Sequence, residues 1–189
     1  MLWIRWYGEN IKMQAFIESY LTFDYGLAFL GGSIFFLLYM IWLKRSNITI
    51  GWRQIVFGIA WTLYLIFLFG STLLNRKIGI AYGVELELFW SYKHAIKTGE
   101  MSLVWQMFNN VLVFIPWGIF WAEISKTMKK MLWNVWSAFL ASLFIEEMQL
   151  IFKCGLFEFD DIFHNVLGGV VGFVIWWSYD KVRKTRKSK

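Results

Sequence analysis

Acidic and amide side chains that could bind a ligand or transfer protons are concentrated in two short runs of this sequence. Within each run they recur at intervals of three or four residues, which places the paired side chains on one face of a helix. Two nearby carboxylates can act as general acid and general base when their surroundings separate their pKa values, and carboxylate oxygens also suit Mg²⁺ or Ca²⁺. The pairs are Glu146 with Gln149, Asp160 with His164, and Asp161 with Asn165.

The composition indicates that lipid, rather than water, surrounds the elements that carry these residues. Hydrophobic residues make up 58% of the chain and charged residues only 17%, whereas soluble chains are roughly 45–50% apolar and about 25% charged. The single cysteine excludes an internal disulfide framework or a cysteine-rich zinc site. The net charge of +6 does not indicate a nucleic-acid partner, because six of the 19 basic residues lie in the last nine positions, as in a cytoplasmic membrane tail.

The hydropathy pattern predicts an all-α fold, a polytopic transmembrane helical bundle. About 20 apolar residues cross a hydrocarbon core, and five stretches bounded by charge approach that length. The predicted spans cover residues 25–43, 55–74, 105–122, 131–152 and 162–179.

Two segments outside the predicted spans are expected to lie at the membrane surface. Arg5 and Glu9 interrupt the apolar run of residues 1–24, which favours an interfacial amphipathic helix over a cleaved signal peptide. Residues 78–104 are too polar to span and too aromatic for a freely solvated loop. The expected organisation is an interfacial helix at 1–24, a transmembrane domain at 25–179 and a basic cytoplasmic tail at 180–189.

The distribution of Lys and Arg predicts which ends of the spans face the cytoplasm. With the N-terminus outside, the inner segments hold 12 basic residues and the outer segments hold seven. Because cytoplasmic segments carry the basic excess, we expect the N-terminus outside and the C-terminus inside.

This orientation brings polar residues of three spans to one depth below the outer surface. Asn109 and Asn110 lie about 6–9 Å below the start of the third span, and Glu146 lies about 9 Å below the end of the fourth, at 1.5 Å per residue. Asp160 and Asp161 open the fifth span. The sequence therefore predicts one outer-face cluster, and ionisable groups at such a depth indicate a functional site.

Purely structural roles are an alternative interpretation of several of these residues. Asp160 and Asp161 could serve only as an N-terminal cap, and Asn110 could hydrogen-bond between helices without any ligand. His164 taken singly is more typical of packing or hydrogen bonding than of metal binding. Gly168 and Gly172, four residues apart, are more typical of close helix packing than of chemistry.

Several motifs together resemble the VanZ-like family of bacterial membrane proteins. The resemblance covers about residues 55–177, and its most specific part is the acidic DDxxxN motif with the preceding ExxQ. The motifs are FNNVLVFIPWG at 108–118, IEEMQ at 145–149 and FEFDDIFHNVLGG at 157–169, with FWSYK at 89–93 similar to the family's surface segment.

The resemblance implies low-level resistance to teicoplanin and related lipoglycopeptides. It does not imply a known reaction, and the cofactor is left unknown. The family's polar positions carry over onto Asn110, Glu146, Gln149, Asp160, Asp161 and Asn165. This chain departs from the family in having Cys154 where Arg is frequent, and Glu85 and Leu88 where Asn and Pro are frequent. The lost Arg removes a partner for the acidic cluster that Lys153 replaces only as a point charge.

Three functions are compatible with these observations. The first is a surface-modifying or ligand-binding membrane protein. Its outer polar site alters the interaction of a lipoglycopeptide or a lipid-linked cell-wall precursor at the cell surface. The second is an enzyme acting on an envelope lipid through paired carboxylates, with a divalent metal on Asp160, Asp161 and Glu146 as a variant. The third is a structural partner in an envelope complex. Membrane lipid is an expected partner in each case.

Overall fold

A computed structural model describes residues 25–46, 51–74, 76, 79, 83–124 and 131–187 of the chain. The interfacial helix expected at 1–24 lies outside the described residues. The chain divides into two compact units, one at residues 1–77 and the other at 78–189, and each is described by itself.

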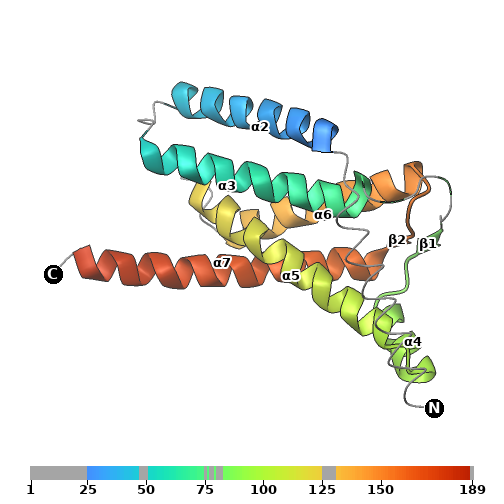
Figure 1. Ribbon diagram of the computed structural model, residues 1–189. Coiled ribbons are helices and arrows are strands. Elements are labelled where there is room, and N and C mark those ends of the chain that lie inside the picture. Colours follow the sequence, from blue (N-terminus) through green and yellow to red (C-terminus); the bar gives the residue numbers. More distant parts are fainter. Residues whose placement is uncertain are drawn as a thin grey trace, which may run out of the picture. The chain divides into compact units, whose positions relative to one another are not determined.

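The described residues of the first unit form a pair of packed helices. Helix α2 spans Tyr25–Arg45 and α3 spans Trp52–Phe69, continuing into a short π-helix at Gly70–Leu74. The two helices run side by side (Figure 1). Glycines allow this close approach, because a Cβ placed on Gly32 would lie 2.3 Å from the side chain of Ile66.

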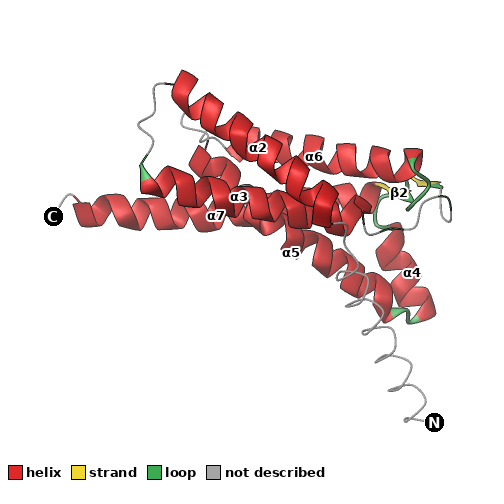
Figure 2. Cartoon of the chain, turned by 45° about the horizontal axis from the view of Figure 1, so that its top comes forward, coloured by secondary structure: helices red, strands yellow, loops and turns green. Residues whose placement is uncertain are grey.

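In its described residues, the second unit consists of four helices and two very short strands. Figure 1 shows the strands and α4 at the end of α7 opposite the C-terminus, and the view in Figure 2 agrees. Helices α5 and α6 pack against α7. The elements are β1 at Val84–Glu85, α4 at Trp90–Thr98, α5 at Met101–Ile124, α6 at Met131–Ile151, β2 at Phe157–Glu158 and α7 at Phe159–Lys187.

Glycines on α5 and α7 bring the two main chains into direct contact. A Cβ on Gly172 would lie 2.0 Å from the carbonyl oxygen of Ile115, and one on Gly118 would lie 2.1 Å from that of Gly169. Real Cβ atoms cannot occupy such positions, so only glycine permits this approach. The predicted packing role of Gly168 and Gly172 is confirmed, since a Cβ on Gly168 would lie 2.2 Å from a backbone oxygen of α5.

The structure confirms the prediction of a helical protein with helices that can cross a membrane. The described part of the chain is mostly helical, with six α-helices. Within the described residues, three helical segments are long and apolar enough to cross a membrane, namely Gln54–Leu74, Met101–Glu123 and Phe159–Arg186. Helices α2 and α6, of 21 residues each, lie where the other two spans are predicted, and a total of five spans stays a prediction.

The segment 78–104, expected at the membrane surface, is tied to the start of α7 by a short parallel pair of strands. Val84 pairs with Phe157 and Glu85 pairs with Glu158. The N–H of Phe157 also donates to the carbonyl of Gly83, 2.9 Å away. This pairing leads the chain from β1 into α4 beside the first turn of α7.

Candidate functional site

The carboxylate of Asp160 caps a helix that lies far away in the sequence. Its Oδ1 accepts the N–H of Phe89 at 2.5 Å and its Oδ2 accepts the N–H of Ser91 at 2.8 Å. These two residues begin α4, whose N-cap Phe89 makes no side-chain cap hydrogen bond of its own. The first N–H groups of a helix lack internal acceptors and favour a negative charge. Asp160, which is only 2% exposed, therefore stabilises the start of α4 from the first turn of α7.

Phe89 adopts a backbone conformation that is unusual for a bulky side chain. Its φ of 65° and ψ of 21° place it in the left-handed region, which costs a non-glycine residue about 1 kcal/mol. The bond to Asp160 offsets part of that cost. The Phe89 ring then lies edge-on to the ring of Phe163 on α7, with centroids 5.5 Å apart.

A second contact joins α4 to α7 through a buried histidine. Nδ1 of His164 lies 2.6 Å from the carbonyl oxygen of Asp160, and its Nε2 lies 2.6 Å from the hydroxyl of Tyr92. A carbonyl oxygen only accepts hydrogen bonds, so Nδ1 carries the proton. In the neutral imidazole, Nε2 then accepts the hydroxyl proton of Tyr92. His164 is 2% exposed and serves as a hydrogen-bonding residue.

Glu146 connects α6 to the strand that precedes α7. Its Oε2 accepts the backbone N–H of Glu158 at 3.0 Å, and its side chain is 2% exposed. Glu147, the next residue, is exposed. The two neighbouring glutamates therefore point to different environments, as expected from the 100° step between helical residues.

Amide and hydroxyl groups complete the contact between α6 and α7. The side-chain amide of Asn165 donates to the hydroxyl of Ser142 at 2.8 Å, and both residues are buried. Gln149 is 3% exposed, and its backbone carbonyl accepts the N–H of Cys154 at 2.9 Å. Burial of this kind requires hydrogen-bond partners within the protein.

Asp161 faces α5, where the amide of Gln106 lies 3.4 Å and 3.5 Å from its two carboxylate oxygens. Asn110, one helical turn further along α5, is half-buried. The Nδ2 atom of Asn110 is buried and has no hydrogen-bond partner in the part of the chain that the structure describes. A buried donor without an acceptor is costly, and nothing in the described residues offsets that cost at Asn110.

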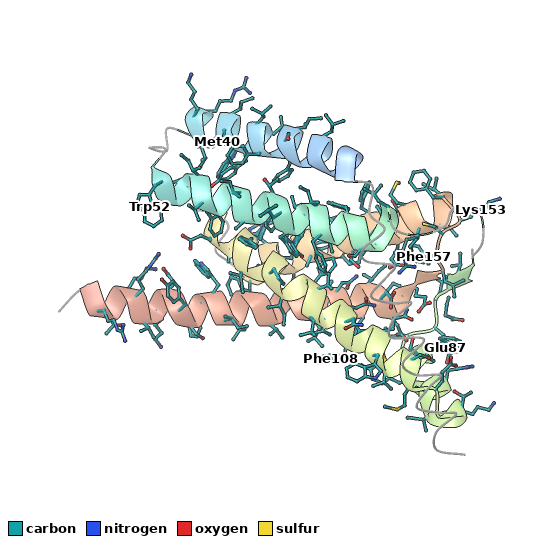
Figure 3. All side chains as sticks on the ribbon, in the orientation of Figure 1. Met40, Trp52, Glu87, Phe108, Lys153 and Phe157 are labelled. Atoms are coloured by element: carbon teal, nitrogen blue, oxygen red, sulfur yellow. The ribbon has the colours of Figure 1, made fainter. Side chains whose placement is uncertain are left out.

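Five of the six candidate residues are buried in the last turns of α6 and the first turns of α7. These are Glu146, Gln149, Asp160, Asp161 and Asn165, each at most 8% exposed. Asn110 lies on the adjoining part of α5 without a hydrogen bond to them among the described residues. Figure 3 shows the labelled residues Glu87 and Phe157 at this same end of the unit.

Sequence reasoning missed several members of this polar end. Gln106 lies four residues before Asn110, and Ser142 lies four residues before Glu146. The helical spacing used for the acidic pairs would have found both of these. Tyr92 carries no comparable signal, because its partner lies 72 residues away.

The metal variant of the enzyme hypothesis has no support in the described residues. Among them, no group of three or more His, Cys, Asp or Glu side chains is placed to hold a metal ion. Two of the proposed ligands, Glu146 and Asp160, are bonded to backbone N–H groups instead.

Comparison with known proteins agrees with the motifs. A family model described as VanZ/LLP1 matches residues 54–180. The chain belongs to the VanZ/LLP1 family. The match begins near the start of α3, ends within α7 and includes the whole polar end. It agrees with the resemblance noted from the sequence motifs at about residues 55–177. Searches of curated proteins and of solved structures give no match. As a VanZ/LLP1 family member with helices apolar enough to span a bilayer, the protein is a membrane protein.

Proposed function

We propose that this VanZ/LLP1 family member lowers the susceptibility of the cell to teicoplanin and related lipoglycopeptides. In this proposal the polar end of the second unit lies at the outer face of the membrane. There it binds a lipid-linked cell-wall precursor or the drug, and so alters the interaction between the drug and the precursor at the cell surface. The segments expected on the cytoplasmic side hold more Lys and Arg than the outer segments, which supports this orientation.

The observation that carries the proposal is the burial of three carboxylates at one end of membrane-spanning helices. Glu146, Asp160 and Asp161 are 2%, 2% and 8% exposed. A charged side chain inside an apolar span costs roughly 2.5–3.5 kcal/mol at the bilayer centre. Near the membrane surface the cost is lower, but ionisable side chains buried below it are still expected either to contact a ligand or to hold the structure that does.

The six candidate residues differ in how well they test the proposal. Asp160 and Glu146 accept backbone N–H groups, so their substitution disturbs folding as well as binding. Asp161 makes long contacts to a side chain, and Nδ2 of Asn110 has no acceptor among the described residues. Asp161→Asn and Asn110→Ala are therefore the direct tests, with exposed Glu147→Gln as the matched control.

The experiment measures three quantities for each variant: membrane abundance, teicoplanin susceptibility and the pool of lipid-linked precursors. Binding at the polar end predicts normal abundance and unchanged precursors, with lost resistance in both variants and not in Glu147→Gln. Precursors that change only with the wild-type protein favour an enzyme, and lost protein favours a structural role. Resistance that persists in both variants at normal abundance rejects the site.

One observation supports an enzyme as a second candidate. Tyr92, His164 and the Asp160 carbonyl form the arrangement of a nucleophile, a base and a group that orients the base. The paired carboxylates proposed from the sequence would then assist proton transfer. Tyr92→Phe removes the hydroxyl and keeps the ring. If the protein acts on an envelope lipid through this residue, that variant abolishes the change in lipid composition that expression of the wild type produces.

A further inference from the structure

The last turns of α7 extend well beyond the length needed to cross a membrane. The helix has 29 residues, which corresponds to about 43 Å at 1.5 Å per residue. A hydrocarbon core is about 30 Å thick. The C-terminal turns of α7 therefore stand beyond the core, at the end opposite the polar cluster.

Aromatic residues mark the level at which α7 leaves the apolar core. Trp177 and Tyr179 are 52% and 59% exposed, and such residues favour the depth of the lipid head groups. Cations lie directly over both rings, with Nζ of Lys181 at 5.3 Å and Cζ of Arg183 at 5.8 Å from the centroids. The positive charges thus begin at the depth where head groups begin.

The single acidic residue in this region is neutralised within the helix. Asp180 is 5% exposed and bonds Arg183 at 2.8 Å and Lys184 at 2.6 Å. The Asp180 carboxylate therefore adds little repulsion toward an anion outside the helix. Lys181 and Arg186 are exposed, and no ion pair involves them among the described residues.

The basic residues surround the helix rather than lining one face of it. Measured from Lys181 at 100° per residue, Arg186, Arg183 and Lys184 lie at about 140°, 200° and 300°. A rigid anionic partner such as a nucleic acid or an acidic protein contacts one face. A layer of lipid head groups contacts a protruding helix from every side, and this distribution fits the layer.

We infer that the C-terminal turns of α7, residues 177–187, bind the phosphate groups of anionic phospholipids. Lys181 and Arg186 contact the phosphates from opposite sides of the helix, while Trp177 and Tyr179 hold the helix at head-group depth. This site lies apart from the polar cluster, and it does not depend on the function proposed above.

The test uses the full-length protein reconstituted into vesicles of equimolar phosphatidylglycerol and phosphatidylcholine. After mild detergent extraction, native mass spectrometry counts the lipids that remain bound. We expect the wild type to retain phosphatidylglycerol preferentially. Lys181→Gln/Arg186→Gln should reduce that preference about 25-fold, since each of the two charges near an anionic surface contributes about fivefold, or about 1 kcal/mol. The control Lys93→Gln/Lys97→Gln removes two charges from α4 instead and leaves the preference unchanged.

Two further arms separate this inference from its alternatives. Lys181→Arg/Arg186→Lys keeps both charges and retains the preference, which shows that lost charge rather than lost folding explains the Gln variants. Excess inorganic phosphate leaves the lipid bound if the ligand is a head-group layer; complete displacement by inorganic phosphate overturns the inference in favour of a discrete phosphate site. Equal retention of the two lipids by the wild type, or an equal loss in the α4 control, also overturns it.

Discussion

The hydroxyl of Tyr92 lies 2.6 Å from Nε2 of His164, although the two residues are 72 positions apart in the sequence. His164 is almost fully buried, whereas 39% of Tyr92 remains exposed. The pair therefore connects the surface of α4 with the interior of the unit. Together with the Asp160 carboxylate, it makes the position of α4 depend on the first two turns of α7.

The first prediction concerns this hydrogen bond. Tyr92→Phe leaves Nε2 of buried His164 without its donor, and it should lower the free energy of unfolding by about 1–2 kcal/mol. The measurement is equilibrium unfolding of the purified protein in mixed micelles. Tyr179→Phe, at an exposed position on the same helix as His164, is the control and should change the value by less than about 0.5 kcal/mol. Equal effects in the two variants would show that the Tyr92 bond contributes nothing.

The second prediction concerns the cap of α4. Asp160→Ala removes the acceptor of two backbone N–H groups and should destabilise the protein by about 3 kcal/mol. Asp160→Asn keeps one acceptor oxygen and should lose about half as much. Limited proteolysis should show new cleavage within residues 86–100 in the Ala variant. Intact protection of that segment in Asp160→Ala contradicts a capping role.

The third prediction concerns the contact between the main chains of α5 and α7. A Cβ on Gly172 would lie 2.0 Å from the backbone oxygen of Ile115, whereas one on Gly31 meets nothing within 4 Å. Gly172→Ala should therefore force the helices apart and greatly reduce the amount of folded protein recovered from membranes. Gly31→Ala, which makes the same chemical change within a helix, should leave the yield unchanged. Comparable yields for the two variants would be evidence against the close approach.

The fourth prediction tests the orientation of the chain. Cys154 is 6% exposed and should react slowly with an impermeant thiol reagent on either side of the membrane. Lys153 is exposed and points away from the helices (Figure 3). Lys153→Cys in a Cys154→Ala background should therefore be labelled on intact cells if the polar end faces outward. Labelling that requires lysis reverses the orientation.

Hydrophobic patterning predicted where the helices lie, and less well where they end. The fourth span was expected at 131–152 and the helix covers Met131–Ile151. The fifth was expected at 162–179, but α7 covers Phe159–Lys187. Hydropathy detects the lipid-facing part of a helix, and it has no signal for basic turns that stay helical beyond the membrane.

Depth and helical spacing led to the prediction that the acidic residues of α6 and α7 lie near one end of their helices. They did not predict the partners of these residues. Asp160 accepts the N–H groups of Phe89 and Ser91, which lie about seventy residues earlier in the sequence. No local sequence pattern encodes such a contact. The parallel pairing of Val84–Glu85 with Phe157–Glu158 is also too short to produce a detectable period.

The glycine contact between α5 and α7 has a mechanical consequence. Because backbone atoms rather than adjustable side chains meet there, the two helices have little freedom to slide along or rotate about each other. The two helices are therefore expected to move as one rigid body, which carries the basic turns of α7 at one end and the buried carboxylates at the other. A displacement of the basic turns would then displace the carboxylates by a similar amount.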